Sequence, residues 1–226
     1  LSHAPGQAMR RKAVVDAAGT STSVLDGLIK SGLVEAFERR PQGRWPVPKL
    51  RRETFSLNDA QQDAADHLVE ALRDGFSVSL IDGVTGSGKT EVYFDVIDRL
   101  LADPDHKGQI LVMLPEIALT GQWLSRFKQR FGCAPALWHS DLTPKMRSET
   151  WRAVSEGEAR VVVGARSALY LPFRDLGLIV LDEEHDGSFK QDEGVTYQAR
   201  DMAVVRANIA KCPIVLASAT PSLETV

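Results

Sequence analysis

The chain has 226 residues, of which 43% are hydrophobic and 25% are charged, and its net charge is −3. This composition is typical of a soluble globular protein with one or two domains, and no apolar run is long enough to cross a bilayer. No basic segment precedes an apolar one at the start, so no signal peptide is expected, and the expected location is the cytoplasm. The two cysteines, Cys133 and Cys212, form no CxxC pair, so we expect small buried thiols and no zinc site.

Residues 1–52 are basic, although the chain as a whole is acidic. They hold ten Lys or Arg and four Asp or Glu, a balance of +6. A basic N-terminal segment joined to an acidic remainder of the chain favours a local contact with nucleic acid, and the alternative is ordinary solvated surface charge. The chain begins with Leu1 and stops at Val226, soon after a buried-strand pattern, so we expect that further parts belong to the protein.

Residues 1–40 are expected to form a small winged-helix DNA-binding domain, possibly incomplete. One helical pattern ends near Ala18, a second has an apolar face over residues 24–29, and Gly32 stops it before a possible strand over residues 33–37. A purely structural or protein-docking role is the alternative. Residues 41–56 then form a basic linker punctuated by prolines.

Residues 57–226 alternate short apolar runs with helical patterns, which predicts βαβ units and a mostly parallel sheet. The strands are near-continuous runs of Val, Ile and Leu, as expected where helices cover both faces of a sheet. Strands are predicted near residues 77–81, 110–114, 136–139, 160–163, 178–181 and 214–217. Helices are predicted over residues 59–74, 89–101, 116–130, 144–156 and 199–210.

A phosphate-binding loop follows the first of these strands. Residues 83–90 read GVTGSGKT and fit the pattern G-x-x-x-x-G-K-[ST] between a strand and a helix. Glycines let backbone N–H groups close around phosphates, and the helix N-terminus favours negative charge. Lys89 is expected to reach the β- and γ-phosphates of ATP, and Thr90 is expected to bind Mg²⁺. The other nucleotide-binding residues of the loop are Gly83, Thr85, Gly86, Ser87 and Gly88.

Acidic residues end a second buried strand, at residues 178–181. Asp182 is expected to hold the Mg²⁺, directly or through water, and Glu183 to polarise the attacking water. His185 is expected to link this site to bound nucleic acid, unless it is only a hydrogen-bonded histidine at a strand end. Glu184 is interpreted as solvated surface.

Residues 182–185 (DEEH) and 218–220 (SAT) resemble the D-E-x-H and S-A-T motifs of superfamily 2 helicases. With the P-loop they indicate a RecA-like lobe that binds ATP. The resemblance implies that the second motif, through Ser218 and Thr220, couples hydrolysis to movement along a strand. A small-molecule P-loop kinase would leave both motifs without a role.

Residues 114–120, 164–173 and 182–200 resemble the bacterial primosomal replication-restart helicases, the primosomal protein N′ family. The resemblance implies that Gln61, rather than Gln62, reads adenine, and that residues 186–200 sense single-stranded DNA. Val195 stands where the family carries tryptophan, which weakens the expected base stacking. The residues that this resemblance assigns to DNA contact or coupling are Thr120, Arg166, His185, Phe189, Lys190, Tyr197 and Arg200. The alternatives are ordinary packing for Phe189 and Tyr197 and a structural ion pair for Arg166.

The same resemblance implies an ATP-dependent DNA helicase of 3′ to 5′ polarity that acts at stalled forks. Its implied partners are forked and single-stranded DNA, primosome proteins, single-strand-binding protein and the loader of the replicative helicase, at the bacterial nucleoid. A second lobe with an arginine finger and a zinc-binding region are expected outside this chain, so the chain alone should hydrolyse ATP slowly. The alternative is a non-catalytic adaptor that binds DNA structure and uses the P-loop lobe only as a scaffold.

Overall fold

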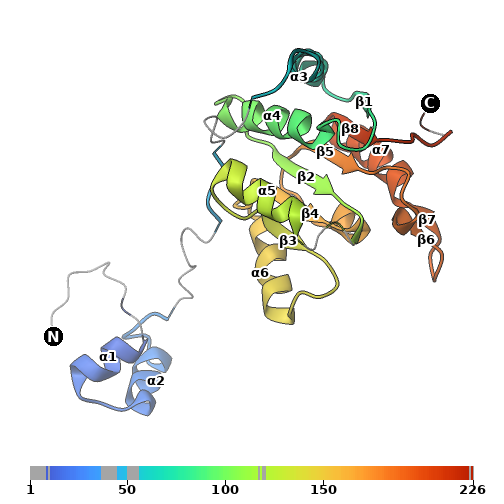
Figure 1. The fold of residues 1–226 in the computed structure, drawn as a ribbon. Coiled ribbons are helices and arrows are strands. Elements are labelled where there is room, and N and C mark those ends of the chain that lie inside the picture. Colours follow the sequence, from blue (N-terminus) through green and yellow to red (C-terminus); the bar gives the residue numbers. More distant parts are fainter. Residues whose placement is uncertain are drawn as a thin grey trace. The chain divides into compact units, whose positions relative to one another are not determined.

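The computed structural model describes residues 9, 11–36, 45–49, 56–116, 118, 121–223 and 225. The chain divides into two compact units, residues 1–44 and residues 45–226. The described part of the smaller unit has two helices, and the larger unit contains an α/β sheet domain (Figure 1). Within the described residues, no helix combines the length and the apolar character that a membrane span requires.

The smaller unit consists of α1 (Arg11–Ala18) and α2 (Thr22–Lys30), joined by an ion pair between Arg11 and Asp26. The strand predicted from residue 33 is not formed over residues 33–36. Gly32 has a φ of +76°, and the N–H groups of Leu33 and Val34 both donate to the carbonyl of Leu28, at 3.1 and 3.3 Å. These residues therefore cap the end of α2 instead of extending. The wing of the predicted winged helix and most of the predicted linker lie outside the described residues.

The larger unit is built on a six-stranded sheet with the order β1-β8-β5-β2-β4-β3, in which every neighbouring pair is parallel. The sheet is buried at its centre, where all five residues of β2 are shielded from solvent, as the runs of Val, Ile and Leu predict. The strands are β1 (Val78–Asp82), β2 (Gln109–Met113), β3 (Ala136–Trp138), β4 (Val161–Gly164), β5 (Leu176–Asp182) and β8 (Ile214–Ser218).

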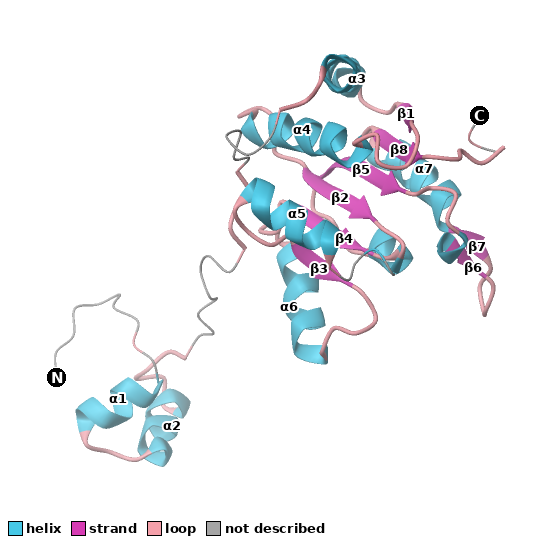
Figure 2. Cartoon of the chain, in the orientation of Figure 1, coloured by secondary structure: helices cyan, strands magenta, loops and turns pink. Residues whose placement is uncertain are grey.

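Helices cover both faces of this sheet (Figures 1 and 2). Successive residues of a strand point to opposite faces, so Ile110 and Val112 join one core while Leu111 and Met113 join the other. The first core includes α3 (Asp59–Ala71), α4 (Lys89–Ala102) and α5 (Gln122–Phe131). The second includes α6 (Pro144–Ser155), η4 (Arg166–Tyr170) and α7 (Ala199–Ala210).

Four aromatic rings fix α4 against α5. Phe94 of α4 meets the rings of Trp123, Phe127 and Phe131 edge-on at 5.2 to 5.6 Å, and Phe127 stacks on Phe131 at 4.3 Å. All four side chains are at most 7% exposed. This cluster sets the position of the helix that follows the P-loop.

The predicted α/β fold with a parallel sheet is confirmed, and each predicted strand overlaps an observed one. The helix predicted over residues 116–130 begins only at Gln122, after Gly121 at its N-terminal cap. The antiparallel hairpin of β6 (Lys190–Gln191) and β7 (Tyr197–Gln198), and the 3₁₀ turns η2 (Leu72–Asp74) and η5 (Gly187–Phe189), were not predicted. Both cysteines are free thiols; Cys212 is buried, but Cys133 is partly exposed.

Candidate functional site

The glycine-rich loop closes tightly between β1 and α4. Gly86 and Gly88 have φ values of +81° and +87°, a region that favours glycine. A side-chain carbon at Gly83 would lie 2.8 Å from the Ser87 hydroxyl, and one at Gly88 would collide with the Gln61 amide. The loop therefore needs glycine at these positions, and the exposed residues between them leave its backbone open to a phosphate ligand.

Lys89 lies at the first position of α4 and is only 8% exposed. Its ammonium donates to the backbone carbonyl of Gly83 at 2.7 Å and more weakly to that of Val84 at 3.4 Å. The ammonium is thus held inside the loop, where a bound phosphate would be its natural counter-charge.

Gln61 joins the start of α3 to the phosphate loop. Its side chain and that of Asn58 form a capping box, with the Asn58 N–H donating to the Gln61 side-chain oxygen at 3.0 Å. The amide nitrogen of Gln61 donates to the carbonyl of Ser87 at 2.8 Å. Gln62 instead contacts Asp66 on the outside of the helix. Gln61 therefore lies at the loop, as the prediction requires, while its role in reading adenine stays a prediction.

The end of β8 brings the two predicted motifs together. Strand β8 lies between β1, which leads into the P-loop, and β5, which ends at Asp182. The N–H of Gly83 donates to the carbonyl of Ser218 at 3.2 Å, and the N–H of Glu184 donates to that of Ala217 at 3.1 Å. Since parallel strands end at one edge, the P-loop, residues 182–185 and residues 218–220 share that edge.

Asp182 is buried, with 7% of its surface exposed, and both carboxylate oxygens accept hydrogen bonds. One oxygen accepts from the N–H of Glu183 at 3.1 Å, and the other accepts from the phenol of Tyr93 at 2.7 Å. Burial raises the pKa of Asp182 above its ordinary value, although the Tyr93 phenol and the Lys89 ammonium both act to lower it. The influence of Lys89 on this carboxyl agrees with the predicted proximity of the P-loop to the acidic pair.

Tyr93 is a functional candidate that the sequence did not reveal. It is fully buried on α4, and the indole N–H of Trp123 donates to its oxygen at 2.6 Å. Burial and the nearby Asp182 carboxylate raise the pKa of Tyr93 well above its ordinary value, so the phenol keeps its proton and donates to Asp182. The only signal in the sequence is a tyrosine three residues after the P-loop threonine, on the same side of a helix.

Glu183 and His185 lie on the turn after β5. Glu183 has a φ of +52°, an unusual backbone conformation for a residue with a side chain, and its side chain is 40% exposed. Its carboxylate lies 3.7 Å from the ring of His185, whose Nδ1 shares a 2.7 Å hydrogen bond with the Ser218 hydroxyl. Ser218 also accepts from the N–H of Thr220 at 3.2 Å. His185 thus joins residues 182–185 directly to residues 218–220.

The prediction that Glu184 is solvated surface is wrong, because the residue is completely buried. Its carboxylate accepts from the N–H of Ser222 at 2.8 Å and from the hydroxyls of Ser222 and Thr225 at 3.1 and 2.9 Å. The guanidinium of Arg200 lies 3.5 Å away. Burial acts to raise the pKa of Glu184, but these donors outweigh it and hold the pKa below its ordinary value. The carboxylate therefore anchors the segment after β8.

Two residues expected to contact DNA are structural instead. Arg200 is 7% exposed and pairs with Glu184, Asp201 and Ser222, so its guanidinium is committed within the protein. Phe189 is 1% exposed and belongs to the second core, so its ring presents no face for base stacking. A buried position at a 3₁₀ turn cannot be told from an exposed loop position by residue type alone.

Three further residues that are predicted to contact DNA lie at or near the hairpin of β6 and β7. Arg166 donates to the carbonyls of Ser188 and Lys190 and so braces the start of the hairpin. Lys190 is exposed and pairs with Asp192 at 3.1 Å, while the ring of Tyr197 meets that of Tyr170 edge-on at 5.5 Å. Val195 is 82% exposed on the segment joining β6 to β7. Thr120 lies outside the described residues.

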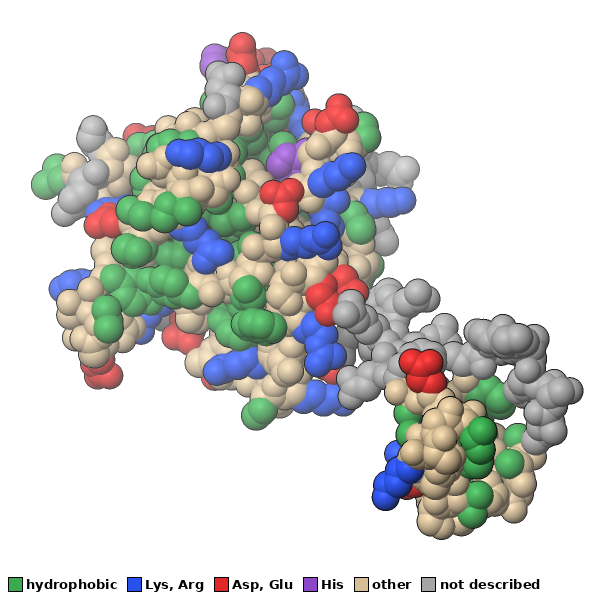
Figure 3. All heavy atoms as spheres, turned by 180° about the vertical axis from the view of Figure 1, so that it is seen from behind, with side chains coloured by type: hydrophobic (Ala, Val, Ile, Leu, Met, Phe, Trp, Pro, Cys, Tyr) green, Lys and Arg blue, Asp and Glu red, His purple; other side chains and the backbone are tan. Residues whose placement is uncertain are grey.

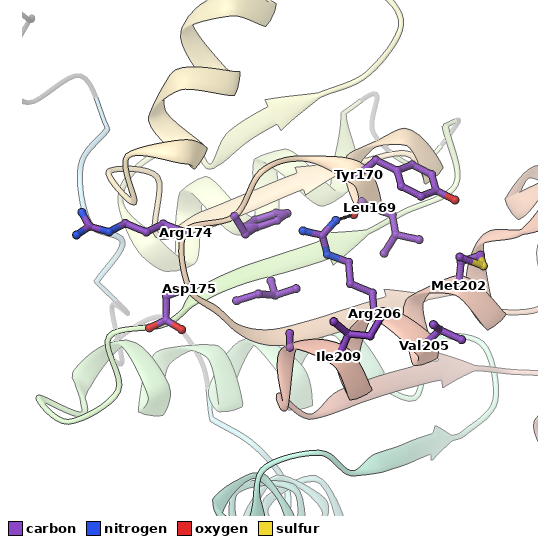
Figure 4. Close-up of a pocket in the computed structure, with 11 residues that line it drawn as sticks. Leu169, Tyr170, Arg174, Asp175, Met202, Val205, Arg206 and Ile209 are labelled. Carbon is purple, nitrogen blue, oxygen red and sulfur yellow. Dashed lines mark hydrogen bonds between the residues drawn. The ribbon is translucent and has the colours of Figure 1, made fainter.

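A groove of about 520 Å³ lies elsewhere, at the start of β5 and along α7 (Figure 4). Its walls include Tyr170, Met202, Val205 and Ile209, and the guanidinium of Arg206 donates to the carbonyls of Leu169 and Leu171. Strand β5 enters this groove at Leu176 and reaches Asp182 at its other end, so the groove is separate from the phosphate loop. Exposed hydrophobic patches lie among basic side chains on the face seen in Figure 3.

The fold and the shared edge of P-loop and acidic motif define the class of protein. The chain belongs to the DEAD/DEAH box helicase family, whose model matches residues 58–226. Structures with a similar fold are the Hef helicase domain of Pyrococcus furiosus (TM-score 0.56, 21% identity, covering 78% of this chain and 36% of that one) and RecG bound to a three-way DNA junction (TM-score 0.53, 22% identity, covering 77% and 24%). At these identities the likeness establishes the fold alone.

Among individual proteins, the chain is similar to the replication restart protein PriA of several bacteria. It is 50% identical to that of Rickettsia conorii over 182 residues, which are 79% of this chain and 28% of the relative. It is 42% identical to that of Bacillus subtilis over 210 residues, or 91% of this chain and 26% of the relative. The resemblance to the replication-restart helicases is thus confirmed, and the chain spans about a quarter of the length of these relatives.

Proposed function

We propose that the chain is the ATP-binding motor lobe of a DNA helicase of 3′ to 5′ polarity that acts in replication restart at stalled forks. One observation carries the proposal: the glycine-rich phosphate loop meets the acidic pair, formed by the buried Asp182 and the partly exposed Glu183, at one edge of the sheet on either side of β8. The likeness to the replication restart proteins supports the biological setting.

The residues at this edge suit Mg²⁺ and ATP. The positive φ values of Gly86 and Gly88 let the loop turn with its backbone open to phosphate oxygens, and Lys89 supplies the positive charge. Thr90 and Asp182 offer the oxygen ligands that Mg²⁺ prefers, and the bound ion would neutralise charge on the phosphates. Glu183, exposed beside Asp182, is the base that orients the attacking water. Gln61 is the proposed reader of the adenine, and the contact of its side-chain amide with the P-loop supports this role.

Coupling to DNA runs through the residues that flank the nucleotide site. His185 and Ser218 form a direct hydrogen bond between the acidic motif and the end of β8. Arg166, Lys190 and Tyr197 place charge and an aromatic face at the hairpin, and Thr120 and Thr220 complete the proposed DNA-side set. The proposed partners are forked and single-stranded DNA, primosome proteins, single-strand-binding protein and the loader of the replicative helicase, in the bacterial cytoplasm at the nucleoid.

Replacing Lys89 with alanine in the full-length protein separates a motor from an adaptor that only binds DNA structure. Without the ammonium, phosphate binding and unwinding should be lost, whereas binding to forked DNA should remain. The matched control is Lys145→Ala, an exposed lysine of α6 that lies outside the site. Normal unwinding and restart activity in Lys89→Ala would refute the motor and support the adaptor.

A further inference from the structure

The phenol of Tyr93 occupies a central place among the residues of the nucleotide site. Tyr93 lies three residues after Thr90, so the two side chains share one side of α4. Its oxygen donates to Asp182 at 2.7 Å and accepts the indole N–H of Trp123 at 2.6 Å. A phenol has one proton and two lone pairs, so these two partners use its proton and one of its lone pairs.

One proposed Mg²⁺ ligand, Asp182, therefore accepts a hydrogen bond from a buried phenol, and the other, Thr90, lies on the same side of the helix that carries this phenol. The Tyr93 ring is 0% exposed and is packed edge-on against Phe94 at 5.4 Å, which fixes its position. Trp123 is held by its stacking on Phe127 at 5.3 Å. The phenol is thus fixed by packing on both sides, and it presents a fixed donor to a carboxylate from another strand.

We propose that Tyr93, held by Trp123, is a positioning residue of the magnesium site that sets the orientation of Asp182 for the metal. The proposal rests on the proposed function, because it concerns the same site. Donors behind metal-binding carboxylates commonly orient the ligand and tune its affinity for the metal. If Tyr93 had only a structural role, its phenol would supply a hydrogen bond to the buried Asp182 carboxylate, and losing it would change only the stability of the fold.

The test measures the Mg²⁺ concentration that half-saturates binding of a fluorescently labelled ATP to the chain, with a parallel titration in EDTA. In Tyr93→Phe the ring remains and only the hydroxyl is lost. We expect this variant to need about 10–100-fold more Mg²⁺, the range seen when outer-shell partners of a metal ligand are removed. Nucleotide binding in EDTA should be unchanged, since the P-loop backbone and Lys89 are untouched.

Two further variants make the test specific. Trp123→Phe keeps the Tyr93 hydroxyl but removes its donor, so the Mg²⁺ requirement should rise by less. Thr150→Val deletes a hydroxyl that is 3% exposed on α6, outside the site, and should leave the Mg²⁺ requirement unchanged. Thermal unfolding without nucleotide establishes that each variant is folded. If Tyr93→Phe does not fold, the Mg²⁺ requirement of Trp123→Phe tests the proposal in its place.

The outcomes separate this inference from the proposed function. If the unaltered chain binds nucleotide with Mg²⁺ and Tyr93→Phe has the same Mg²⁺ requirement, the positioning role is refuted while the motor lobe stands. If Tyr93→Phe does not fold, an unchanged Mg²⁺ requirement in Trp123→Phe refutes the positioning role in the same way. If the unaltered chain shows no Mg²⁺-dependent binding, the proposed function fails, and the inference fails with it.

Discussion

At the scale of single residues, the four positions 182–185 have four different environments. Asp182 is buried against Tyr93, and Glu184 is buried against the segment after β8. Glu183 and His185 are partly exposed, and their side chains lie 3.7 Å apart. Strand β5 ends at Asp182, and the positive φ of Glu183 begins the turn that gives these neighbours different environments. Neighbouring acids therefore divide into residues suited to chemistry and residues that hold the structure.

Glu184 predicts a particular dependence of stability on pH. Its folded pKa is lowered, so its contribution to stability is fully present above the unfolded pKa of about 4.3 and is lost as the pH falls through the folded value. Glu184→Gln should lower the free energy of unfolding at pH 7 by about 2 kcal/mol, the range for hydrogen bonds to a charged group. The difference from the unaltered chain should shrink below pH 4, as measured by urea unfolding at several pH values.

Glu193→Gln is the control for this experiment, since Glu193 is exposed near the hairpin tip. It should leave the unfolding free energy unchanged at pH 7 and at pH 3. A difference between Glu184→Gln and the unaltered chain that stays constant from pH 7 to pH 3 would contradict the account of the Glu184 carboxylate.

At the scale of elements, the sheet depends on close backbone approaches as much as on apolar runs. Gly177, the second residue of β5, lies against the loop that enters β2. A side-chain carbon there would be 2.9 Å from Gly108 and 2.7 Å from the ring of His106. Strands β5 and β2 are neighbours, and Gly177 lies near the end of β5 that is opposite to Asp182.

Gly177→Ala should therefore lower the free energy of unfolding by about 1–3 kcal/mol, as expected for overpacking. The matched control is Gly187→Ala, in η5, where an added carbon meets nothing within 4 Å. That change should stay within about 0.5 kcal/mol. Thermal or urea unfolding of both variants measures the difference, and equal stability of the two variants would show that the close approach is not tight.

The sequence predicted elements and motifs better than it predicted the burial of single side chains. Short runs of Val and Ile bounded by turn residues separate strands from helices by their length, and the P-loop has a fixed spacing, so both were found correctly. The partners of Asp182 and Glu184 come from α4, α7 and the segment after β8, and no pattern in the sequence encodes such distant pairings. For the same reason Phe189 and Arg200 were assigned to DNA, although tertiary packing buries both.

At the scale of the whole molecule, the proposed function makes this chain one lobe of a larger motor. Its P-loop and acidic motif lie at an open sheet edge, and arginine fingers that complete such sites are supplied by another lobe or partner. The isolated chain is therefore expected to bind ATP and to hydrolyse it slowly, with little response to DNA. Turnover by the isolated chain at the rate of the full-length protein would contradict this expectation.

The most direct test of the central claim is the ATPase rate of the full-length protein with and without forked DNA, compared with that of Glu183→Gln. Forked DNA should stimulate the unaltered protein. Glu183→Gln should still bind nucleotide but lose about 10²–10⁴-fold in the stimulated rate, the usual contribution of a general base. A rate that does not respond to DNA, or stimulation that survives in Glu183→Gln, would contradict the proposal that this sheet edge is the catalytic centre of a DNA-driven motor.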